Sequence, residues 1–287
     1  MELVKDYMNI AKKRHLLNDM TTEIFGFTFE DWYLAGFYEG EYIPYSYEKN
    51  GEIIANASAN IMKIVQNSKE KLYIQIGTVM TRPQYRKQGL ASKLIATIIS
   101  DYEDQVDGFY LYANLNALDF YKKIGFRRLD QWRYSAKICS EPMSGDCYKI
   151  AGEKELAAYR NLLRNAAINQ RLDQINRSSL QLFYTGKMEN VYCNVDKDNF
   201  IVAWLDGETL YLDSVITADE TSVMEIIKKI PLKFNKVILG FTPKTEDADF
   251  FIAEKYDGQD DYRFFYMGAS LLEIEKDRLY FPVMSHA

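Results

Sequence analysis

The stretch Arg86-Lys87-Gln88-Gly89-Leu90-Ala91 lies between an apolar segment, residues 72–80, and an amphipathic segment, residues 90–100. The first segment has the composition of a buried strand, and the second has the apolar spacing of a helix. A glycine-containing loop that opens a helix presents free backbone N–H groups and the positive end of the helix dipole, which together bind phosphate. Arg86 adds a permanent positive charge. The stretch therefore predicts a strand–loop–helix unit that binds a phosphate or pyrophosphate.

The spacing of this loop excludes two common phosphate-binding motifs. It matches neither the G-x-G-x-x-G of a dinucleotide-binding fold nor the G-x-x-x-x-G-K-[ST] of a nucleotide hydrolase, and what remains is R-x-x-G-x-A. A second pattern lies further along the chain, where Asn114, Ala117 and Tyr121 precede a glycine-phenylalanine pair at 125 and 126. Ala117 and Tyr121 fall on one face of a predicted helix, so periodicity alone makes Tyr121 a core aromatic residue.

Together, the two patterns resemble those of the GCN5-related N-acetyltransferase (GNAT) family, R-x-x-G-x-A for the acetyl-CoA loop and N-x-x-A-x-x-(apolar)-Y-x-x-x-G-F for the next helix. The resemblance implies an α+β fold, layered α/β/α, around a mixed and mostly antiparallel sheet. It also implies acetyl-CoA as acetyl donor. The implied cofactor-binding residues are Val79, Met80, Thr81, Arg86, Lys87, Gln88, Gly89, Leu90, Ala91, Ser92, Asn114, Ala117 and Tyr121.

The strand before the loop is where the resemblance places the reaction, with the main chain of Val79 and Thr81 on the cofactor. Alternation puts Tyr73, Gln75, Gly77, Val79 and Thr81 on one face of this strand. Many family members carry a glutamate on this strand that relays the amine proton, but no carboxylate occurs here, and Tyr73 stands near that position. Tyr73 and Gln75 are catalytic candidates on this ground, and the general base stays unassigned.

The C-terminus offers two further candidates for the base. Residues 281–287 form an apolar run, and the tandem enzymes that the chain resembles can direct their C-terminus into the active site. His286 or the terminal carboxylate of Ala287 would then accept the amine proton. The competing interpretation is an exposed edge strand. By the same resemblance Tyr121 would protonate the departing CoA thiolate.

Length and composition restrict the class of protein. A chain of 287 residues predicts two domains. A net charge of −6 argues against nucleic acid as a partner and favours a cationic substrate such as an amine. Three scattered cysteines and two histidines predict neither a disulfide framework nor a metal site. The chain shows no signal-peptide core and no apolar run of membrane-spanning length, so we expect a cytoplasmic protein without membrane contact.

The domain junction is expected within residues 138–146, which are rich in turn formers. Residues 1–140 would be the catalytic domain that binds acetyl-CoA. Residues 141–287 repeat its element order and would be a degenerate GNAT-like copy, so the sheet is duplicated. Hairpin turns are expected at 50–51 and 206–207. Helices are expected at 7–17, 30–37, 90–100, 117–124, 153–165, 218–229 and 247–255.

Two features predict that the second copy lacks a CoA loop. Its strand-to-helix junction, residues 217–220, reads Thr-Ala-Asp-Glu, which places carboxylates at the helix N-terminus, where they would repel a pyrophosphate. In addition, Phe251 stands roughly where Tyr121 stands in the first copy, so the hydroxyl is missing.

These observations predict an acetyl-CoA-dependent N-acetyltransferase that acts on a primary amine of a small molecule by direct transfer through a ternary complex. The aromatic residues crowded into 25–47 either shape a pocket for an aromatic or alkyl amine or pack a helix onto the sheet. Two alternatives stay open. One is a non-catalytic acyl-CoA-binding sensor or interaction module. The other is an aminoacyl-tRNA-dependent transferase, which would want a basic surface.

Overall fold

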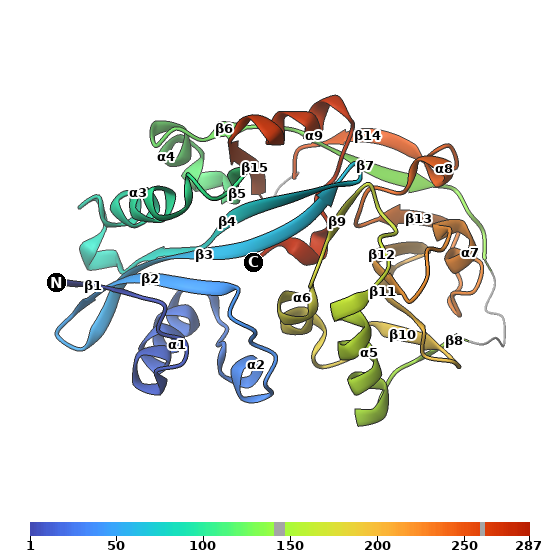
Figure 1. Ribbon diagram of the computed structural model, residues 1–287, viewed down its shortest axis with the longest axis horizontal. Helices are drawn as coiled ribbons and strands as arrows, with labels where there is room; N and C mark the ends of the chain where they lie inside the picture. Colours follow the sequence, from blue (N-terminus) through green and yellow to red (C-terminus); the bar gives the residue numbers. More distant parts are fainter. Residues whose placement is uncertain (141–146, 259–261) are drawn as a thin grey trace.

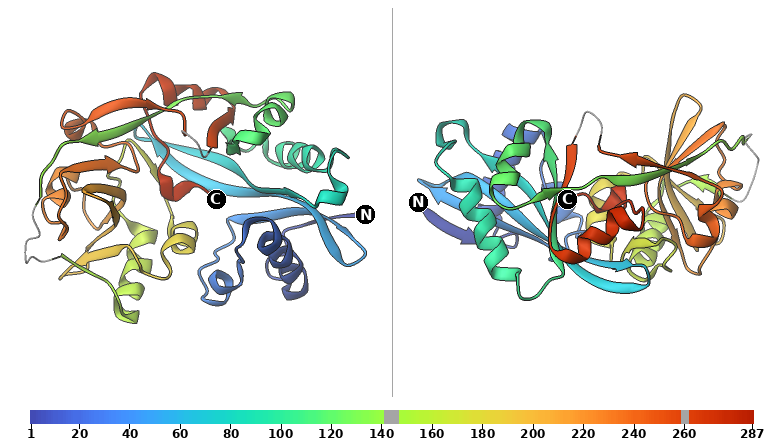
Figure 2. Two further views of the ribbon diagram at one scale, coloured as in Figure 1. Left: turned by 180° about the vertical axis from the view of Figure 1, so that it is seen from behind. Right: turned by 90° about the horizontal axis from the view of Figure 1, so that it is seen from above.

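The computed structural model describes residues 1–140, 147–258 and 262–287. Residues 141–146 of the expected junction therefore lie outside the described residues. Within the described ranges the chain forms two β-sheets with helices packed on their faces (Figures 1 and 2). Both sheets are mixed and mostly antiparallel, and this confirms the predicted α+β fold with a duplicated sheet.

The first sheet has the order β1-β2-β3-β4-β5-β15-β6, and β9 also pairs with β3. Helices α1 and α2 lie on one face of this sheet and α3 and α4 lie on the other (Figure 1), which is the predicted three-layer arrangement. Its elements are β1 (Glu2–Lys5), α1 (Ala11–Phe25), α2 (Glu30–Leu34), β2 (Tyr42–Lys49), β3 (Glu52–Gln66), β4 (Lys69–Thr81), α3 (Leu90–Tyr102), β5 (Gly108–Asn114), α4 (Leu118–Lys123), β6 (Arg127–Arg128), β9 (Leu172–Gln174) and β15 (Tyr262–Met267).

The second sheet has the order β14-β7-β13-β12-β11-β10-β8. Its strands are β7 (Gln131–Ala136), β8 (Cys147–Lys149), β10 (Val191–Asn194), β11 (Asn199–Asp206), β12 (Thr209–Thr217), β13 (Lys236–Leu239) and β14 (Ile252–Tyr256). The remaining helices are α5 (Glu153–Asn165), α6 (Ser178–Thr185), α7 (Val223–Ile227), α8 (Thr245–Ala248) and α9 (Glu273–Lys276).

The two sheets share one internal plan. Each holds a single parallel strand pair, β4 with β5 and β12 with β13, among antiparallel neighbours in the described residues. A helix joins the strands of each parallel pair, α3 in the first sheet and α7 in the second. The strand–loop–helix–strand unit that the sequence predicted around Gly89 therefore occurs twice.

Three strands cross between the halves, and one of them, β9, pairs with β3 in the first sheet. β15, from the C-terminal part of the chain, pairs with β5 in the first sheet, whereas β7, from the N-terminal part, pairs with β13 in the second. The expected division at residue 140 does not separate the sheets, because the first half contributes β7 to the second sheet and the second half contributes β9 and β15 to the first. This exchange ties the two halves together through main-chain hydrogen bonds.

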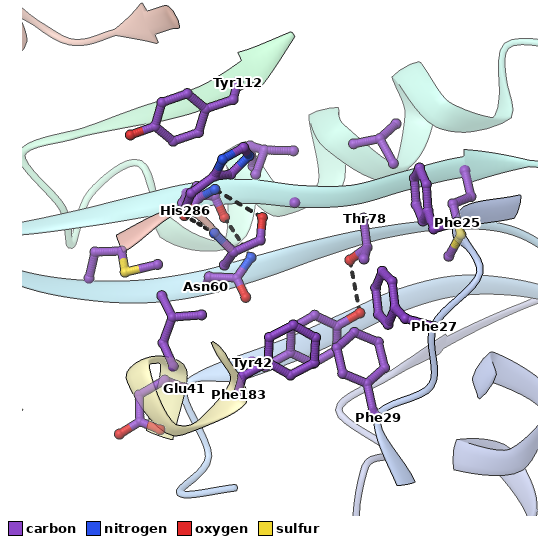
Figure 3. A pocket seen from close by; sticks show the side chains of 18 of the residues that line it. Phe25, Phe27, Phe29, Glu41, Tyr42, Asn60, Thr78, Tyr112, Phe183 and His286 are labelled. Carbon is purple, nitrogen blue, oxygen red and sulfur yellow. Dashed lines mark hydrogen bonds between the residues drawn. The ribbon is translucent and has the colours of Figure 1, made fainter. Parts of the chain in front are cut away.

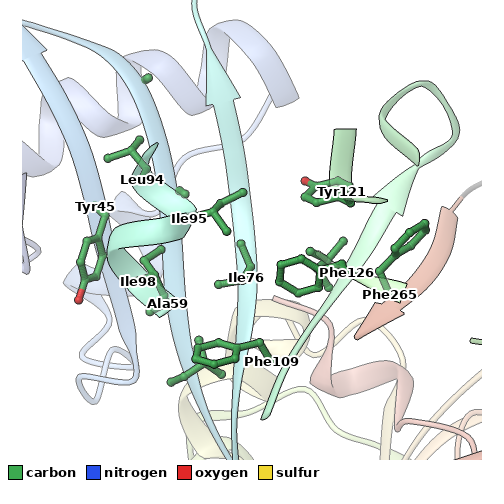
Figure 4. Close-up of a cluster of buried hydrophobic side chains, with 14 of the residues drawn as sticks. Tyr45, Ala59, Ile76, Leu94, Ile95, Ile98, Phe109, Tyr121, Phe126 and Phe265 are labelled. Atoms are coloured by element: carbon green, nitrogen blue, oxygen red, sulfur yellow. The ribbon is translucent and has the colours of Figure 1, made fainter. Parts of the chain in front are cut away.

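The core of the first half forms as the periodicity of residues 90–100 predicts. Leu94, Ile95 and Ile98 of α3 are buried and pack with Ile76 of β4 and Phe109 of β5 (Figure 4). These three positions share one helix face, and burying them fixes α3 on the sheet. The start of α3 is thereby held beside the end of β4.

Several predicted boundaries are confirmed and others are wrong. The Asn50-Gly51 turn joins β2 to β3, and α5 has the predicted bounds. The helix expected at 247–255 is wrong, because α8 ends at Ala248 and residues 252–256 pair with β7 as strand β14. Pairing with a distant strand overrides local propensity there. Every helix in the described ranges is too short or too polar to cross a bilayer.

Candidate functional site

β4 carries a bulge directly after Gly77. Asn56 of β3 pairs with Met80 and Ser58 pairs with Gly77, so two residues of β4 face one residue of β3. The first of these two, Thr78, has a φ of 42°. Its hydroxyl lies 2.8 Å from the Tyr42 hydroxyl and 2.6 Å from the Ser58 hydroxyl. These hydrogen bonds hold a β-branched residue in a left-handed conformation that it rarely adopts.

The bulge reverses the alternation of side chains along β4. Val79 packs with Ile76 on the face covered by α3, whereas Met80 is buried on the opposite face, near Trp32. The prediction that Val79 shares the face of Gln75 is therefore wrong, because strict alternation does not continue through the extra residue. A glycine inside a strand often marks a bulge, but it does not give the register.

β4 and β5 diverge after Gln75, ahead of the bulge. Their parallel ladder pairs Tyr73–Gln75 with Gly108–Tyr110, although the strands continue to Thr81 and Asn114. The diverging edges leave main-chain groups of β4 open toward the space between the strands. The divergence opens the space in which the resemblance places the cofactor, beside the main chain of Val79 and Thr81.

The loop at the start of α3 has the geometry of an anion site. Gly89 has a φ of 73° and stands at the N-cap, a conformation that favours glycine. The Lys93 N–H donates to the Gly89 carbonyl at 3.1 Å, so the amides of residues 90–92 precede the first hydrogen bond of the helix. Arg86 is tied to the end of β4 by its Nε, which donates to the Thr81 carbonyl at 3.1 Å. The loop, Arg86 and the free amides thus meet at one end of the diverging strands.

A cavity of about 790 Å³ lies where β4 and β5 diverge. Arg86 and Ala91 line it from the loop, Asn114 and Tyr121 from β5 and α4, and His286 from the C-terminus. Of the predicted site residues, those that line the cavity are Gln75, Val79, Met80, Thr81, Arg86, Ala91, Asn114, Ala117, Tyr121, His286 and Ala287. The cavity therefore joins the expected CoA loop to the C-terminus.

Six predicted site residues do not line this cavity, namely Tyr73, Lys87, Gln88, Gly89, Leu90 and Ser92. Tyr73 is fully buried in a separate core, where its hydroxyl donates to Gln66 Oε1 at 2.8 Å and lies 3.2 Å from Ser270 Oγ. Burial raises the pKa of Tyr73 to about 12. With its hydroxyl engaged in the core, Tyr73 is not in place to take a proton from an amine.

The C-terminus enters the cavity beside β4. The Ala287 N–H donates to Gln75 Oε1 at 2.8 Å, and Gln75 Nε2 donates to the Ala287 oxygen at 3.0 Å. The Tyr184 hydroxyl donates to the His286 carbonyl. A Cβ added to Gly77 would lie 2.8 Å from the Ala287 oxygen, so only glycine permits this approach. The expected alternative of an exposed edge strand is wrong, because Val283–Ser285 form a 3₁₀ turn that leads inward.

The His286 side chain packs against aromatic rings. Its ring centroid lies 4.0 Å from that of Tyr112 and 5.3 Å from that of Tyr262. Burial lowers the pKa of His286 to about 4, so the imidazole is neutral at neutral pH. The Ala287 main chain, by contrast, lies beside Gly77 of β4.

Tyr121 combines the two interpretations that the sequence left open. It is 6% exposed and belongs to the core below α3, with Phe126 and Phe265 as neighbours. Figure 4 shows its hydroxyl turned away from these two rings, and Tyr121 lines the cavity. Burial raises its pKa to about 12, so the phenol keeps its proton at neutral pH.

The N-terminus of α7, the equivalent helix in the second half, is already capped by a carboxylate. The Val223 N–H donates to Asp247 Oδ2 at 2.8 Å, and the Ser222 hydroxyl donates to Asp247 Oδ1 at 2.5 Å. Ser222 also accepts from the Met224 N–H as N-cap. A carboxylate does lie at this helix N-terminus, as expected, but it comes from Asp247 rather than from residues 219–220. The helix begins at 223 instead of 218.

Sequence reasoning missed a large part of the cavity wall. Phe183, Tyr184 and Leu180 come from α6, in the second half of the chain. Trp32 Nε1 donates to the Ser179 carbonyl at 2.8 Å and fixes α6 beside α2. No local pattern marks these residues, since only the packing of distant segments brings them together.

Comparison with known proteins agrees with this geometry. Residues 6–126 match the acetyltransferase (GNAT) family. This part of the chain belongs to the GNAT family. The match runs from α1 to α4 and includes the loop at Gly89 and Tyr121. No curated protein sequence matches the chain.

Two solved structures extend the likeness in fold to both halves of the chain. A GCN5-related N-acetyltransferase from Kribbella flavida has a TM-score of 0.56 at 17% identity, covering 92% of this chain and 70% of that one. A probable N-acyltransferase from Enterococcus faecalis has a TM-score of 0.55 at 13% identity, covering 94% of this chain and 73% of that one. At these identities the likeness shows a shared fold.

Proposed function

We propose that this GNAT-family protein is an acetyl-CoA-dependent N-acetyltransferase that acts on a primary amine of a small molecule by direct transfer. One observation carries the proposal. A single cavity is lined by Arg86 and Ala91 at the loop and the start of α3, by the diverging strands β4 and β5, and by Ala287. Acetyl-CoA would supply an acetyl thioester, and the amides of residues 90–92 with Arg86 suit its pyrophosphate.

The chain supplies a group for each proton in the reaction. An amine must lose a proton to attack a thioester carbonyl, and the terminal carboxylate of Ala287 is the proposed acceptor. His286 is the weaker candidate, since its ring packs on Tyr112 and carries no charge that would attract an ammonium group. As the C–S bond breaks, the Tyr121 hydroxyl would protonate the thiolate. Main-chain N–H groups at the bulge of β4 would stabilise the oxyanion.

The second half is proposed to lack a CoA site. The Asp247 carboxylate already accepts a hydrogen bond from the Val223 N–H, and its negative charge would repel a pyrophosphate. The absence of a carboxylate on β4 keeps one alternative open, a domain that binds acetyl-CoA without turnover. Release of the CoA thiol in the presence of a panel of amines distinguishes an enzyme from such a sensor.

The sharpest test of the mechanism moves the carboxylate while keeping His286. Extending the chain by two glycines after Ala287 displaces the terminal charge from Gln75. We expect turnover to fall by the 10²–10⁴ typical of a lost acid–base group, with acetyl-CoA affinity unchanged in calorimetry. Deleting residues 285–287 should have the same effect. Full turnover in both variants would exclude the C-terminus from the reaction.

A further inference from the structure

The cavity has two chemically different ends (Figure 3). Asn60 and His286 lie at one end, beside the C-terminal carboxylate held by Gln75. Aromatic rings gather at the other end, where Phe27, Phe29, Tyr42 and Phe183 meet (Figure 3). The Phe29 and Tyr42 ring centroids are 4.6 Å apart, and those of Phe27 and Phe183 are 5.6 Å apart. A molecule that fills the cavity therefore meets a polar, charged end and an apolar end.

The aromatic end is built by both halves of the chain and is held in place. Phe183 of α6 lies against Trp32 of α2 at 5.9 Å between centroids. The hydrogen bond from Trp32 Nε1 to the Ser179 carbonyl joins the two helices at 2.8 Å, and the Glu39 N–H donates to Ser179 Oγ at 3.3 Å. These bonds fix the wall before any ligand arrives, so ordering it adds little cost to binding.

The aromatic end offers no counter-charge for a second ammonium group. Among the cavity-lining residues that the structure describes, Glu41 carries the one acidic side chain. Its Oε2 is buried in the protein, and Figure 3 shows its carboxylate turned away from the rings. Placing a second positive charge there without a partner is unfavourable. The cavity thus suits one charge, at the C-terminal carboxylate.

The packing of the rings also argues against a cation bound on their faces. Phe27 meets Phe29 at 87° and Phe183 at 76°, and Trp32 meets Phe183 at 89°. In such edge-to-face pairs the negative face of one ring is covered by the edge of its neighbour. Cations need an open face, whereas an aromatic ligand can add an edge or an offset face to the cluster.

We propose that the acceptor is an arylalkylamine, with its aromatic ring among Phe27, Phe29 and Phe183 and its single amine at the C-terminal carboxylate. This assignment rests on the proposed acetyl transfer. It narrows the aromatic or alkyl amine that residues 25–47 predicted to an amine that carries an aromatic ring. It also gives the second half of the chain a role, because Phe183 determines specificity for a reaction whose cofactor loop lies in the first half.

The test compares three amines, 2-phenylethylamine, spermidine and kanamycin, with acetyl-CoA and the full chain. We expect the highest kcat/KM for 2-phenylethylamine. Phe183→Ala should raise its KM about tenfold or more with little change in kcat, because the ring binds ground and transition states alike. Phe183→Leu, which keeps apolar volume, should give an intermediate KM. Phe250→Ala, at an exposed phenylalanine of the second half, is the matched control and should change nothing.

Calorimetric binding of 2-phenylethylamine without acetyl-CoA gives a readout that does not need turnover. We expect binding that weakens about tenfold or more in Phe183→Ala. A higher kcat/KM for spermidine or kanamycin would overturn the arylalkylamine assignment and leave the acetyltransferase proposal standing. Bound acetyl-CoA with no transfer to any amine would overturn both. A KM unaffected by both Phe183 variants would also overturn the assignment.

Discussion

The N-termini of α3 and α7 occupy equivalent places in the two sheets, yet they offer opposite chemistry. Each follows the end of a strand, β4 or β12, and each leads into a parallel strand, β5 or β13. At α3 a glycine loop leaves amides free beside Arg86. At α7 the Asp247 carboxylate binds the Val223 N–H. The shared topology therefore specifies the fold, and a few side chains at the helix start decide which anion can bind.

The largest expected effect concerns the hydroxyl that distinguishes Tyr121 from Phe251. Tyr121→Phe keeps the ring in the core and removes the proposed proton donor, so turnover should fall by roughly 10²–10⁴. Melting temperature and acetyl-CoA affinity should change little, and KM should change less than kcat. Phe251→Tyr, the reciprocal change in the second half, should add no activity. Near-normal turnover in Tyr121→Phe would make this tyrosine a packing residue.

The next effect tests the loops themselves. Gly89→Glu places a negative charge at the free amides, and steric exclusion with like-charge repulsion should cost about 3 kcal/mol, or about 100-fold in acetyl-CoA affinity. Gly207→Glu is the matched control, since Gly207 also has a positive φ, 57°, and open space around it. Calorimetry should show one acetyl-CoA per chain in the wild type. Two sites per chain, or unchanged affinity in Gly89→Glu, would contradict the asymmetry.

A smaller effect tests whether the charge of Asp247 alone closes the second site. Asp247→Asn keeps an acceptor for Val223 and removes the charge, which should destabilise the protein by about 1 kcal/mol and lower the melting temperature by about 2–4 °C. Asp249→Asn, at an exposed neighbour, should have no effect. We expect acetyl-CoA stoichiometry to stay at one. A second site in Asp247→Asn would mean that the second copy retains a cryptic CoA loop.

The sequence predicted what local chemistry determines. The Gly89 loop, the hairpin at Asn50-Gly51 and the periodic face of α3 all depend on residues close together in the chain, so their patterns were readable. The C-terminal approach to the site was predicted as one of two alternatives. This approach requires glycine at position 77, because the Ala287 main chain passes too close for a Cβ. No spacing rule in the sequence identifies that requirement.

The remaining features depend on partners that are distant in sequence. β7 and β15 are six-residue strands whose apolar pattern fits either sheet, so only assembly decides that they exchange. Phe183 joins the aromatic end of the cavity because α6 packs beside α2. Asp247 caps α7 from 24 residues further along the chain than Val223. Tyr73 matched a family position in spacing but lies in a separate core.

The smallest expected effect contrasts two ionisable groups, one in each half, that burial shifts in opposite senses. Burial lowers the pKa of His286 from an ordinary value of 6.5 to about 4. Burial raises the pKa of Asp213 in β12 from 3.8 to about 6, although the hydrogen bond from Trp204 acts in the opposite direction. Between pH 6.5 and 4 the unfolded chain binds more protons at His286, so this group lowers stability as pH falls. Between pH 4 and 6 the folded chain binds more protons at Asp213, so this group lowers stability as pH rises.

Each contribution can be removed separately. His286→Phe keeps the contact with Tyr112 and cannot titrate, so its melting temperature relative to wild type should increase as pH falls from 7 to 4.5. Asp213→Asn keeps an acceptor for Trp204, whose Nε1 donates to Asp213 Oδ2 at 2.8 Å. Its melting temperature relative to wild type should increase in the other direction, as pH rises from 4.5 to 7. Scanning calorimetry of the three proteins across this range measures both slopes. Melting-temperature curves that stay parallel to wild type across this pH range would mean that neither group is as buried as its contacts indicate. A pH slope of the same sign in Asp213→Asn and His286→Phe would refute the contrast between the halves.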